Sequence, residues 1–251
     1  MKTVVVGASS GLGRCIGIGL ARRGGQLALL ARRLGNLETA ASEAGEGTLA
    51  IECDVTDDAS VRAAIAEAAA GLGGIDALIY TPAFGPLKRL QDTDADTWRQ
   101  VFDTNVTGAA IVTAAALPHL EASSGTAVYL SSVSASMTAP WPGLGAYAVS
   151  KAALDKMVEA WQAEHPHVGF TRLVVGDCAG GEGDGMTQFT QTWDQDLAGE
   201  LVTTWIERSL IAGAFIDVDH LASVVDGIIR GGASITMPSV TVTPRLAAPT
   251  T

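Results

Sequence analysis

Cysteine is scarce in this 251-residue chain, and its three cysteines, Cys15, Cys53 and Cys178, lie far apart. No CxxC pair is present, and the four histidines are too scattered to form a ligand set. The sequence therefore indicates no disulfide framework, and we expect no metal. Because Met1-Lys2-Thr3 leads directly into an apolar segment without a signal peptide, we expect a reducing, cytoplasmic location.

Basic residues are also few, since 16 lysines and arginines accompany 27 aspartates and glutamates, for a net charge of −11. A nucleic-acid-binding protein needs a basic face, so we expect no nucleic-acid partner. No apolar run reaches the roughly 20 residues that a membrane-spanning helix needs, so we expect no membrane association. With 47% hydrophobic and 17% charged residues, the composition is typical of a globular protein.

Short apolar segments alternate with helical patterns along the chain. The sequence predicts strands over residues 3–6, 26–31, 48–53, 76–80, 126–130, 168–175 and 235–242. It predicts helices over residues 11–23, a short Ala-rich stretch, 59–70, 94–121, 144–164 and 217–229, the one over 94–121 being too long to be unbroken around Gly108. Because the strands are apolar throughout, they predict a parallel sheet covered on both faces. We expect an α/β fold, a single-domain Rossmann-like doubly wound parallel sheet of about seven strands over residues 1–245, with a flexible tail at 246–251.

A glycine-rich turn, Gly7-Ala8-Ser9-Ser10-Gly11-Leu12-Gly13, joins the first predicted strand to the first helix. Glycines permit a tight turn and close approach of the backbone, and the helix N-terminus can face a pyrophosphate. The spacing is GxxxGxG rather than GxGxxG, and a plain connection is the alternative, but the flanking strand and helix favour a dinucleotide site. The predicted cofactor-binding residues of this turn are Gly7, Ser9, Ser10, Gly11, Leu12 and Gly13.

The second predicted strand ends at Ala31-Arg32-Arg33, where a NAD-binding protein usually has an acidic residue for the ribose 2′-hydroxyl. No carboxylate is present there to repel a 2′-phosphate, and two guanidinium groups can bind one in bidentate fashion. The sequence therefore favours NADP(H) over NAD(H), with a solvated Arg pair as the alternative. Asp54-Val55, after the third strand, is placed to meet the adenine, and a turn or helix-capping Asp is the alternative there.

Tyr147 and Lys151 lie four residues apart in a predicted helix, which puts a phenol and an ammonium group on one face. An ammonium group beside a phenol favours the phenolate and should lower the pKa of Tyr147 from its usual value of about 10. A tyrosine tuned in this way can act as an acid/base near neutral pH. Alone, the pair also fits an amphipathic helix with a snorkelling Lys.

Together these features resemble the short-chain dehydrogenase/reductase family. The matching residues follow the family's order over about residues 1–176, namely Gly7, Gly11, Gly13, Asp54-Val55, Asn105-Val106-Thr107-Gly108, Ser131-Ser132, Tyr147 and Lys151. The resemblance implies that Tyr147 exchanges a proton with the substrate, and that Lys151 bonds the nicotinamide ribose and lowers the pKa of that phenol. It also implies that Asn105, at a helix kink, holds a water that relays protons to Lys151. Helices 94–121 and 144–164 would form an interface in a homodimer or homotetramer.

The resemblance also calls for a Ser that bonds the substrate oxygen, and two serines compete for this role. The family's usual spacing before the Tyr selects Ser134. The end of the predicted strand 126–130 selects Ser132 instead, and the loop around Trp141 can absorb two extra residues. We favour Ser132, because catalytic groups of such sheets emerge at the carboxyl ends of strands.

Two segments depart from the family's pattern. Tyr80-Thr81-Pro82-Ala83 replaces Asn-Asn-Ala-Gly, so Pro82 removes a donor and Tyr80 is expected to bring bulk near the cofactor, which still passes over Thr81 and Pro82. After the sixth strand, Gly176-Asp177 replaces Pro-Gly, and we have no account of an acid there. The Gly-rich acidic loop that follows is expected to be mobile, and Thr187 corresponds to the Thr that bonds the nicotinamide carboxamide.

A substrate lid is expected over about residues 178–215. Its large apolar residues recur at helix-like spacing, and for most of them we favour packing in the core or between subunits over contact with a substrate: Met186, Phe189, Trp193, Leu197, Leu201, Trp205 and Ile206. With Trp141 they indicate a fairly apolar pocket, which suits a hydrophobic or aromatic carbonyl compound.

The sequence thus predicts an NADP-dependent oxidoreductase that transfers hydride between nicotinamide and a carbonyl or secondary alcohol substrate, with Asn105, Ser132, Tyr147 and Lys151 as the catalytic set. A cofactor-binding sensor or scaffold with little or no catalysis is the alternative, favoured by the altered segments at 80–83 and 176–177. Epimerase or dehydratase chemistry is a further alternative, because a fold does not fix a reaction.

Overall fold

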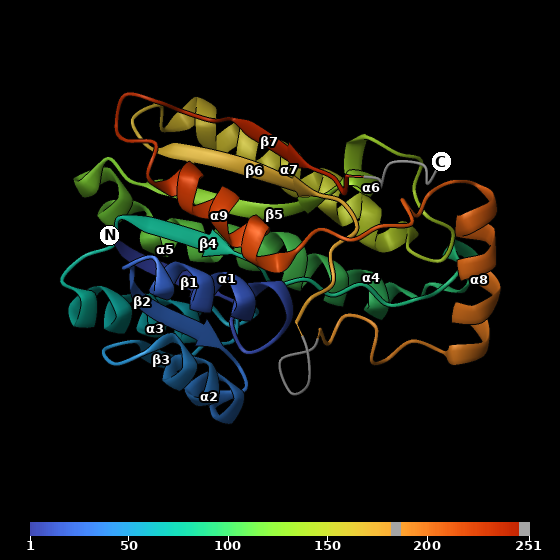
Figure 1. Cartoon of the computed structure of the whole chain (residues 1–251), viewed down its shortest axis with the longest axis horizontal. Helices are drawn as coiled ribbons and strands as arrows, with labels where there is room; N and C mark the ends of the chain where they lie inside the picture. The colour runs from blue at the N-terminus through green and yellow to red at the C-terminus, as the bar shows by residue number, and fades with distance from the viewer. Residues whose placement is uncertain (182–186, 246–251) are drawn as a thin grey trace, which may run out of the picture.

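The computed structural model describes residues 1–181 and 187–245 and places seven parallel strands in one sheet (Figure 1). The predicted doubly wound parallel sheet is confirmed. Across the sheet the order is β3-β2-β1-β4-β5-β6-β7. The strands are β1 (Lys2–Val6), β2 (Gln26–Ala31), β3 (Leu49–Glu52), β4 (Ala77–Tyr80), β5 (Thr126–Ser132), β6 (Gly169–Val175) and β7 (Ser239–Val242). The predicted tail at 246–251 and residues 182–186 of the Gly-rich loop lie outside the described residues.

Helices cover both faces of this sheet, as its apolar strands predict. One face packs against α3 (Asp58–Leu72), α5 (Gly108–Ser123) and α7 (Gly145–Glu164). The other face packs against α1 (Gly11–Arg22), α2 (Leu34–Ala44) and α9 (Val218–Ile229). The remaining helical segments are η1 (Leu90–Asp92), α4 (Ala95–Phe102), η2 (Asp103–Thr107), α6 (Val133–Ser136) and α8 (Gln195–Glu207).

The direction of sheet growth reverses between β1 and β4. From β1 the chain builds outward through β2 and β3, then returns to pair β4 with the free edge of β1 and builds the other way. In such a sheet, the carboxyl ends of the strands at this point border a ligand-binding crevice.

Several element ends differ from the prediction by a few residues, because capping and pairing decide them. α3 runs past Gly71 and stops before Gly73, whose φ of 72° is the left-handed conformation that ends helices. Its start is as predicted, since Asp57 accepts from the backbone N–H groups of Ala59 and Ser60. β7 begins at Ser239 rather than at residue 235, because its pairing with β6 begins there.

The predicted helix 94–121 forms one long helix with a π turn inside it. The N–H of Gly108 donates to the carbonyl of Asp103, five residues back, so the irregularity lies around Asn105 and the chain continues into α5. By length and composition alone this helix, Ala95–Ser123, could cross a membrane. Core helices of water-soluble proteins pass the same test, and 39% of its most apolar window is buried against the rest of the described chain.

Candidate active site

The carboxyl ends of the strands border a cleft of about 930 Å³. It is formed by the turn after β1, the ends of β2 and β3, the segment after β4, the end of β5 and the start of α7. All the predicted site residues except Asn105 line it: Gly7, Ser9, Ser10, Gly11, Leu12, Gly13, Arg32, Arg33, Asp54, Val55, Thr81, Pro82, Ser132, Tyr147, Lys151 and Thr187. The fold thus brings residues that are far apart in the sequence into one cleft.

The turn after β1 depends on its glycines. Gly7 has φ +83° and Gly11 has φ +57°, conformations that side chains rarely adopt. A Cβ atom at Gly13 would lie 2.5 Å from the Gly7 carbonyl oxygen and 2.3 Å from Thr81 Oγ1. The N-cap residue Ser10 makes no side-chain capping hydrogen bond. The Ser10 side chain therefore does not cap the first N–H groups of α1, which could donate to a pyrophosphate instead.

Arg33 reaches back from the end of β2 to this turn. Its Nη2 donates to Ser10 Oγ at 2.7 Å and to Ser9 Oγ at 3.1 Å. A guanidinium group and two hydroxyl groups therefore meet at one rim of the cleft, a donor set that suits a phosphate monoester. Arg32 is exposed beside it.

Asp54 closes a tight turn after β3. Its Oδ1 accepts from the Thr56 N–H at 2.9 Å and from Thr56 Oγ1 at 2.8 Å. Partial burial raises the pKa of this carboxyl. The Thr56 hydrogen bonds and the charge of Arg32 together lower it by more, so the pKa of Asp54 lies below its usual value. Asp54 therefore stabilises a turn, which was one of the alternatives from the sequence, and it also lines the cleft.

Tyr147 and Lys151 lie one turn apart on α7, as predicted. Lys151 is 2% exposed, and its Nζ donates to the carbonyl oxygen of Leu130 in β5 at 2.7 Å. The same nitrogen lies 5.8 Å from the centre of the Tyr147 ring. The backbone of β5 therefore fixes the position of the ammonium group beside the phenol.

The pKa of Tyr147 is raised in this structure, contrary to the sequence-based expectation. Burial of the phenol raises its pKa to about 12, and the Ser132 side chain, which lowers it, opposes only part of this rise. The ammonium group that was expected to lower it is directed at Leu130, and burial lowers the pKa of Lys151 to about 8. The described side chains alone therefore keep Tyr147 protonated near neutral pH.

Of the two candidate serines, Ser132 is the one whose side chain lowers the pKa of Tyr147. Ser132 ends β5 and caps α6, where its Oγ accepts from the Ser134 N–H at 3.2 Å. Ser134 is 6% exposed, and its Oγ lies 2.9 Å from Ser132 Oγ. Both serines line the cleft, so the choice of Ser132 as the catalytic serine stays a prediction.

Asn105 lies in the π turn, is fully buried and does not line the cleft. Its Oδ1 accepts from the Phe84 N–H at 2.7 Å, and its Nδ2 donates to the Phe84 carbonyl at 2.9 Å and to Ser150 Oγ at 2.8 Å. The amide thus holds the segment after β4, which lines the cleft. The water relay that the family resemblance implies stays a prediction.

The sequence suggested that Tyr80 brings bulk near the cofactor, but the structure places its side chain elsewhere. Side chains alternate along β4, and that of Tyr80 points away from the cleft into the core beneath α5. Its side chain is fully buried, and its hydroxyl donates to the carbonyl of Thr104 at 2.5 Å.

The sequence offered no explanation for Asp177, and the structure shows that it bonds the C-terminal end of the predicted lid. Its Oδ2 accepts from the Ala212 N–H at 2.7 Å, and its carbonyl accepts from the Ile216 N–H at 2.8 Å. The next residue, Cys178, forms a parallel bridge with Ile216. Asp177 therefore connects the end of β6 to the segment before α9. Thr187, on the other side of the undescribed loop, lies 3.3 Å from where a Cβ of Gly11 would be.

Among its described residues the predicted lid contains one helix, α8, which Figure 1 shows beyond the carboxyl ends of the strands. The helix-like spacing of the apolar residues therefore corresponds to a real helix only from residue 195 onward. Leu201 and Trp205 face inward from α8 and Ile206 is 62% exposed, whereas Phe189 and Trp193 precede the helix. Met186 lies outside the described residues.

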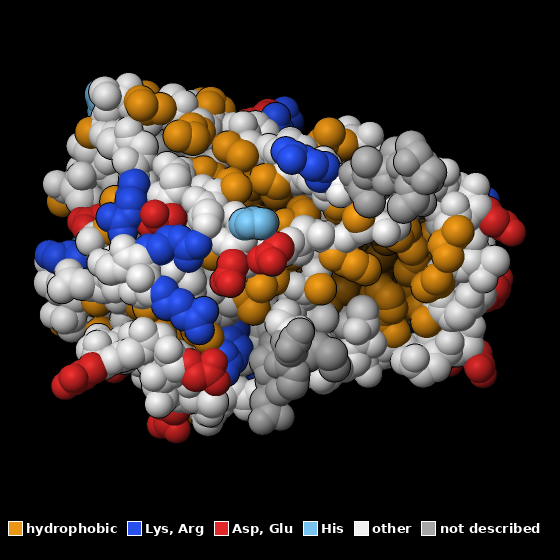
Figure 2. Space-filling model, in the orientation of Figure 1, with side chains coloured by type: hydrophobic (Ala, Val, Ile, Leu, Met, Phe, Trp, Pro, Cys, Tyr) orange, Lys and Arg blue, Asp and Glu red, His pale blue; other side chains and the backbone are white. Residues whose placement is uncertain are grey.

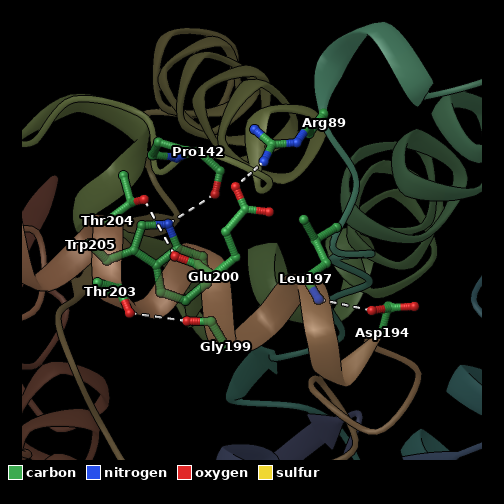
Figure 3. A network of polar contacts seen from close by, with 9 residues as sticks. All are labelled: Arg89, Pro142, Asp194, Leu197, Gly199, Glu200, Thr203, Thr204 and Trp205. Atoms are coloured by element: carbon green, nitrogen blue, oxygen red, sulfur yellow. Dashed lines mark hydrogen bonds and ion pairs between the residues drawn. The ribbon is translucent and has the colours of Figure 1, made fainter.

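α8 is attached to two loops that border the cleft (Figure 3). Arg89 Nη2 donates to Glu200 Oε1 at 2.5 Å, and Trp205 Nε1 donates to the Pro142 carbonyl at 2.9 Å. Trp193 Nε1, just before the helix, donates to the Gly85 carbonyl at 2.8 Å. α8 is therefore held by the segments after β4 and before α7.

Aromatic rings form a series from Tyr147 into the lid. Neighbouring ring centres are 5.0 to 6.0 Å apart in the order Tyr147, Phe189, Trp193, Trp205 and, at 5.2 Å from Trp205, Trp141. These rings belong to a hydrophobic cluster with Leu87, Leu144 and Leu201. Figure 2 shows a hollow beside α8 whose walls are mostly hydrophobic side chains. One side of the cleft is therefore apolar.

Sequence reasoning missed two buried polar residues near the catalytic pair. Asp155, one turn beyond Lys151 on α7, is 4% exposed. Ser150 accepts from Asn105 and donates to the Tyr147 carbonyl at 2.7 Å. The spacing of Tyr147, Lys151 and Asp155 places all three on one helix face and was the available signal for Asp155. It carries little weight alone, because Asp in a helix usually faces solvent.

Comparisons with known proteins match the chain over most of its length. A family model described as short chain dehydrogenase matches residues 2–194. A short chain dehydrogenase of Pseudocercospora fijiensis is 35% identical over 167 residues, which cover 64% of this chain and 53% of that protein. The chain thus spans about half the length of that relative. An 11-beta-hydroxysteroid dehydrogenase A of Sesamum indicum is 29% identical over 245 residues, covering 94% of this chain and 68% of that protein.

Solved structures of lower identity share the fold. An alcohol dehydrogenase from the archaeon Thermococcus sibiricus, complexed with 5-hydroxy-NADP, has a TM-score of 0.78 at 22% identity, covering 97% of this chain and 98% of its own. A 3-ketoacyl-(acyl-carrier-protein) reductase from Brucella melitensis, complexed with NADH, has a TM-score of 0.79 at 19% identity, covering 96% and 95%. The two complexes hold different nicotinamide cofactors.

Proposed function

The chain belongs to the short-chain dehydrogenase/reductase family of NAD(P)-dependent oxidoreductases, and we propose that it uses NADP(H) to interconvert a carbonyl compound and its secondary alcohol. The observation that carries this proposal is the convergence of Ser132, Tyr147 and Lys151 on the cleft that also contains the Gly-rich turn. A proton donor, a hydroxyl partner and a cation therefore share a cleft with a phosphate-binding turn, as hydride-transfer chemistry on a carbonyl requires.

The residues of the cleft fit a dinucleotide. Gly13 has no room for a Cβ, so α1 packs directly on the turn after β1, and its N-terminus is placed where it could face a pyrophosphate. The bound nicotinamide would supply or accept the hydride. Gly7, Ser9, Ser10, Gly11, Leu12 and Gly13 would hold the phosphates, Asp54 and Val55 the adenine, Thr81 and Pro82 the middle of the molecule, and Lys151 and Thr187 the nicotinamide end.

The contacts of Arg33 support NADP(H) over NAD(H). Its guanidinium already meets two hydroxyl groups at the cleft rim, and Arg32 adds a second positive charge. A 2′-phosphate would replace water around these donors with charge-assisted hydrogen bonds. NAD(H) has no group that uses them.

Tyr147 would act as the acid in carbonyl reduction and as the base in alcohol oxidation. Its raised pKa keeps the proton on the phenol, which suits the acid role at neutral pH. Ser132, whose side chain lowers the pKa of the phenol, would donate to the substrate oxygen. The Lys151 charge would stabilise the phenolate that remains after proton transfer.

The aromatic series beside Tyr147 supports a hydrophobic or aromatic substrate. Phe189, Trp193 and Trp141 line the cleft, and burial of apolar substrate surface against them would contribute about 25 cal/mol per Å². We also propose a cytoplasmic protein that forms a homodimer or homotetramer without nucleic-acid or membrane partners, on the basis of its composition and the family resemblance.

The catalytic proposal is tested by NADPH oxidation over a panel of aliphatic and aromatic ketones and aldehydes, comparing the wild-type protein with Tyr147→Phe. We expect turnover by the wild type and a loss of about 10²- to 10⁴-fold in the variant, the usual contribution of general acid catalysis. Equal rates for the two proteins would refute Tyr147 as the acid. NADPH binding by calorimetry with no turnover on any carbonyl would support the sensor or scaffold instead.

The cofactor proposal is tested by the dissociation constants of NADPH and NADH. Arg33→Ala should weaken NADPH binding by about tenfold or more and change NADH binding by less than about twofold, since only the charge-assisted bonds are lost. Arg62→Ala, which removes an exposed Arg from α3, is the control and should change neither. Tighter binding of NADH than NADPH by the wild type would overturn the preference.

A further inference from the structure

The π turn leaves one carbonyl, that of Thr104, without its helical donor. In a regular helix the Gly108 N–H would donate to Thr104, four residues back. Here it donates to Asp103 instead. The Thr104 carbonyl accepts from the hydroxyl of Tyr80, in the neighbouring strand β4, at 2.5 Å. A side chain from the sheet therefore satisfies the acceptor that the π turn creates.

Gly108 makes this approach possible. A Cβ at that position would lie 2.8 Å from the Tyr80 hydroxyl and 2.9 Å from the Val55 carbonyl oxygen. The helix therefore has no side chain where the phenol meets it. The absence of a Cβ at Gly108 and the hydroxyl of Tyr80 act together to hold the irregular turn against the sheet.

The π turn carries Asn105, whose amide holds Phe84 through both its N–H and its carbonyl. Phe84 belongs to the segment after β4, and residues 81–85 line the cleft. Asn105 also donates to Ser150, which donates to the Tyr147 carbonyl. A change in the turn would therefore reach the cofactor side of the cleft through Asn105.

We propose that Tyr80 is a positioning residue whose hydroxyl holds the π turn, and thereby Asn105 and the cleft segment 81–85, in the geometry that binds the dinucleotide. This inference rests on the proposed function only for the identity of the ligand. Tyr80 itself touches neither the cleft nor the catalytic pair. Tyr80 stabilises the π turn through one hydrogen bond to the Thr104 carbonyl, in a helix that would otherwise favour regular α-helical hydrogen bonds.

The chain offers a matched control in Tyr129. It pairs with Tyr80 across the two neighbouring strands, its side chain faces the same core, and it is equally buried. Its hydroxyl bonds Thr113 Oγ1 at 2.7 Å, in the regular part of α5. Tyr80→Phe and Tyr129→Phe therefore each remove one buried hydroxyl and keep the ring, but only the first removes a partner of the π turn.

The first measurement uses the ligand-free protein and needs no activity. We expect hydrogen exchange in the Tyr80→Phe variant to accelerate by about tenfold or more at the amides of Phe84 and Gly108, the size expected for one lost buried hydrogen bond. In the Tyr129→Phe variant these two amides should exchange at the wild-type rate. Unchanged exchange at both amides in Tyr80→Phe, or the same acceleration in both variants, would overturn the proposal.

The second measurement is the NADPH dissociation constant and the split between KM and kcat. Tyr80→Phe should weaken NADPH binding by about tenfold and raise its KM, with a smaller change in kcat, because the catalytic pair lies on α7. Tyr129→Phe should stay within about twofold of the wild type, although both variants lose stability. Equal effects of the two variants would reduce Tyr80 to a core residue. If the wild type binds no NADPH, the proposed function fails, and the exchange experiment alone decides the role of Tyr80.

Discussion

Asp155 lies one turn beyond Lys151 on the buried face of α7, and its charge opposes the loss of the Lys151 proton. Burial lowers the pKa of Lys151 to about 8, and Asp155 is the group that raises it. Burial also raises the pKa of Asp155 itself, while the Ser131 hydroxyl and the charges of Arg172 and Lys151 lower it and Glu159 raises it. The ammonium group beside Tyr147 therefore depends on a buried carboxylate.

Asp155→Asn should change the pH dependence of alcohol oxidation. Oxidation needs the Lys151 cation to stabilise the phenolate, so the rate should fall as pH rises through the pKa of Lys151, about 8. Without the Asp155 charge this pKa falls further, and the alkaline limb of kcat/KM should move to lower pH by about 1 unit. Glu159→Gln, which removes a more exposed charge from the same helix, should leave the limb in place. An alkaline limb that stays fixed in Asp155→Asn would contradict the coupling.

Lys151→Met should stabilise the protein while abolishing turnover. The folded-state pKa of Lys151 lies below its usual value of 10.5, so the folded protein carries an unfavourable buried cation below about pH 8. Replacing it with an apolar side chain should raise the free energy of unfolding by on the order of 1–3 kcal/mol at pH 6.5, after the lost bond to Leu130 is considered.

The sign of this effect can be followed with pH. Between about pH 8 and 10.5 the unfolded wild type holds the Lys151 proton and the folded wild type does not, so this group makes wild-type stability rise with pH. The advantage of Lys151→Met should therefore shrink between pH 6.5 and 9.5. Urea unfolding of both proteins at the two pH values measures it. An advantage that grows with pH would show that the buried cation is not the cause.

The parts of the fold that follow from local patterns could be predicted from the sequence. Apolar runs gave the strands, and Asp57 marked a helix start because capping uses neighbouring residues. The pair Tyr147 and Lys151 could be placed on one face because helical spacing is local. The cleft could be anticipated as well, since parallel strands bring their carboxyl ends together.

Features that depend on distant contacts could not be predicted in this way. The sequence indicated an irregular helix near Asn105, but not that the hydroxyl of Tyr80, in a strand, would bond to it. The raised pKa of Tyr147 comes from burial, which spacing does not report. The role of Asp177 is a bond to Ala212 across the lid. In each case the deciding partner lies on another element of the fold.

Ser132→Ala and Ser134→Ala should differ sharply in turnover. Ser132 ends β5 and is the serine that lowers the pKa of Tyr147, so its removal should lower kcat by about 10²- to 10³-fold, as loss of an oxyanion donor does. Ser134 contacts Ser132, and its loss should cost less than about tenfold, the value of one hydrogen bond. Steady-state kinetics on one ketone with saturating NADPH measures both. The reverse order would assign the role to Ser134.

Gly13→Ala should destabilise the protein even without a ligand. The added Cβ would lie 2.5 Å from the Gly7 carbonyl oxygen, so the turn or α1 would have to move. We expect the free energy of unfolding to fall by about 3 kcal/mol. Gly35→Ala, in the exposed first turn of α2, meets nothing within 4 Å and should stabilise by about 0.5 kcal/mol. Thermal unfolding of the ligand-free variants separates the two effects. Equal stability of the two variants would mean that α1 does not pack on the turn as closely as the structure shows.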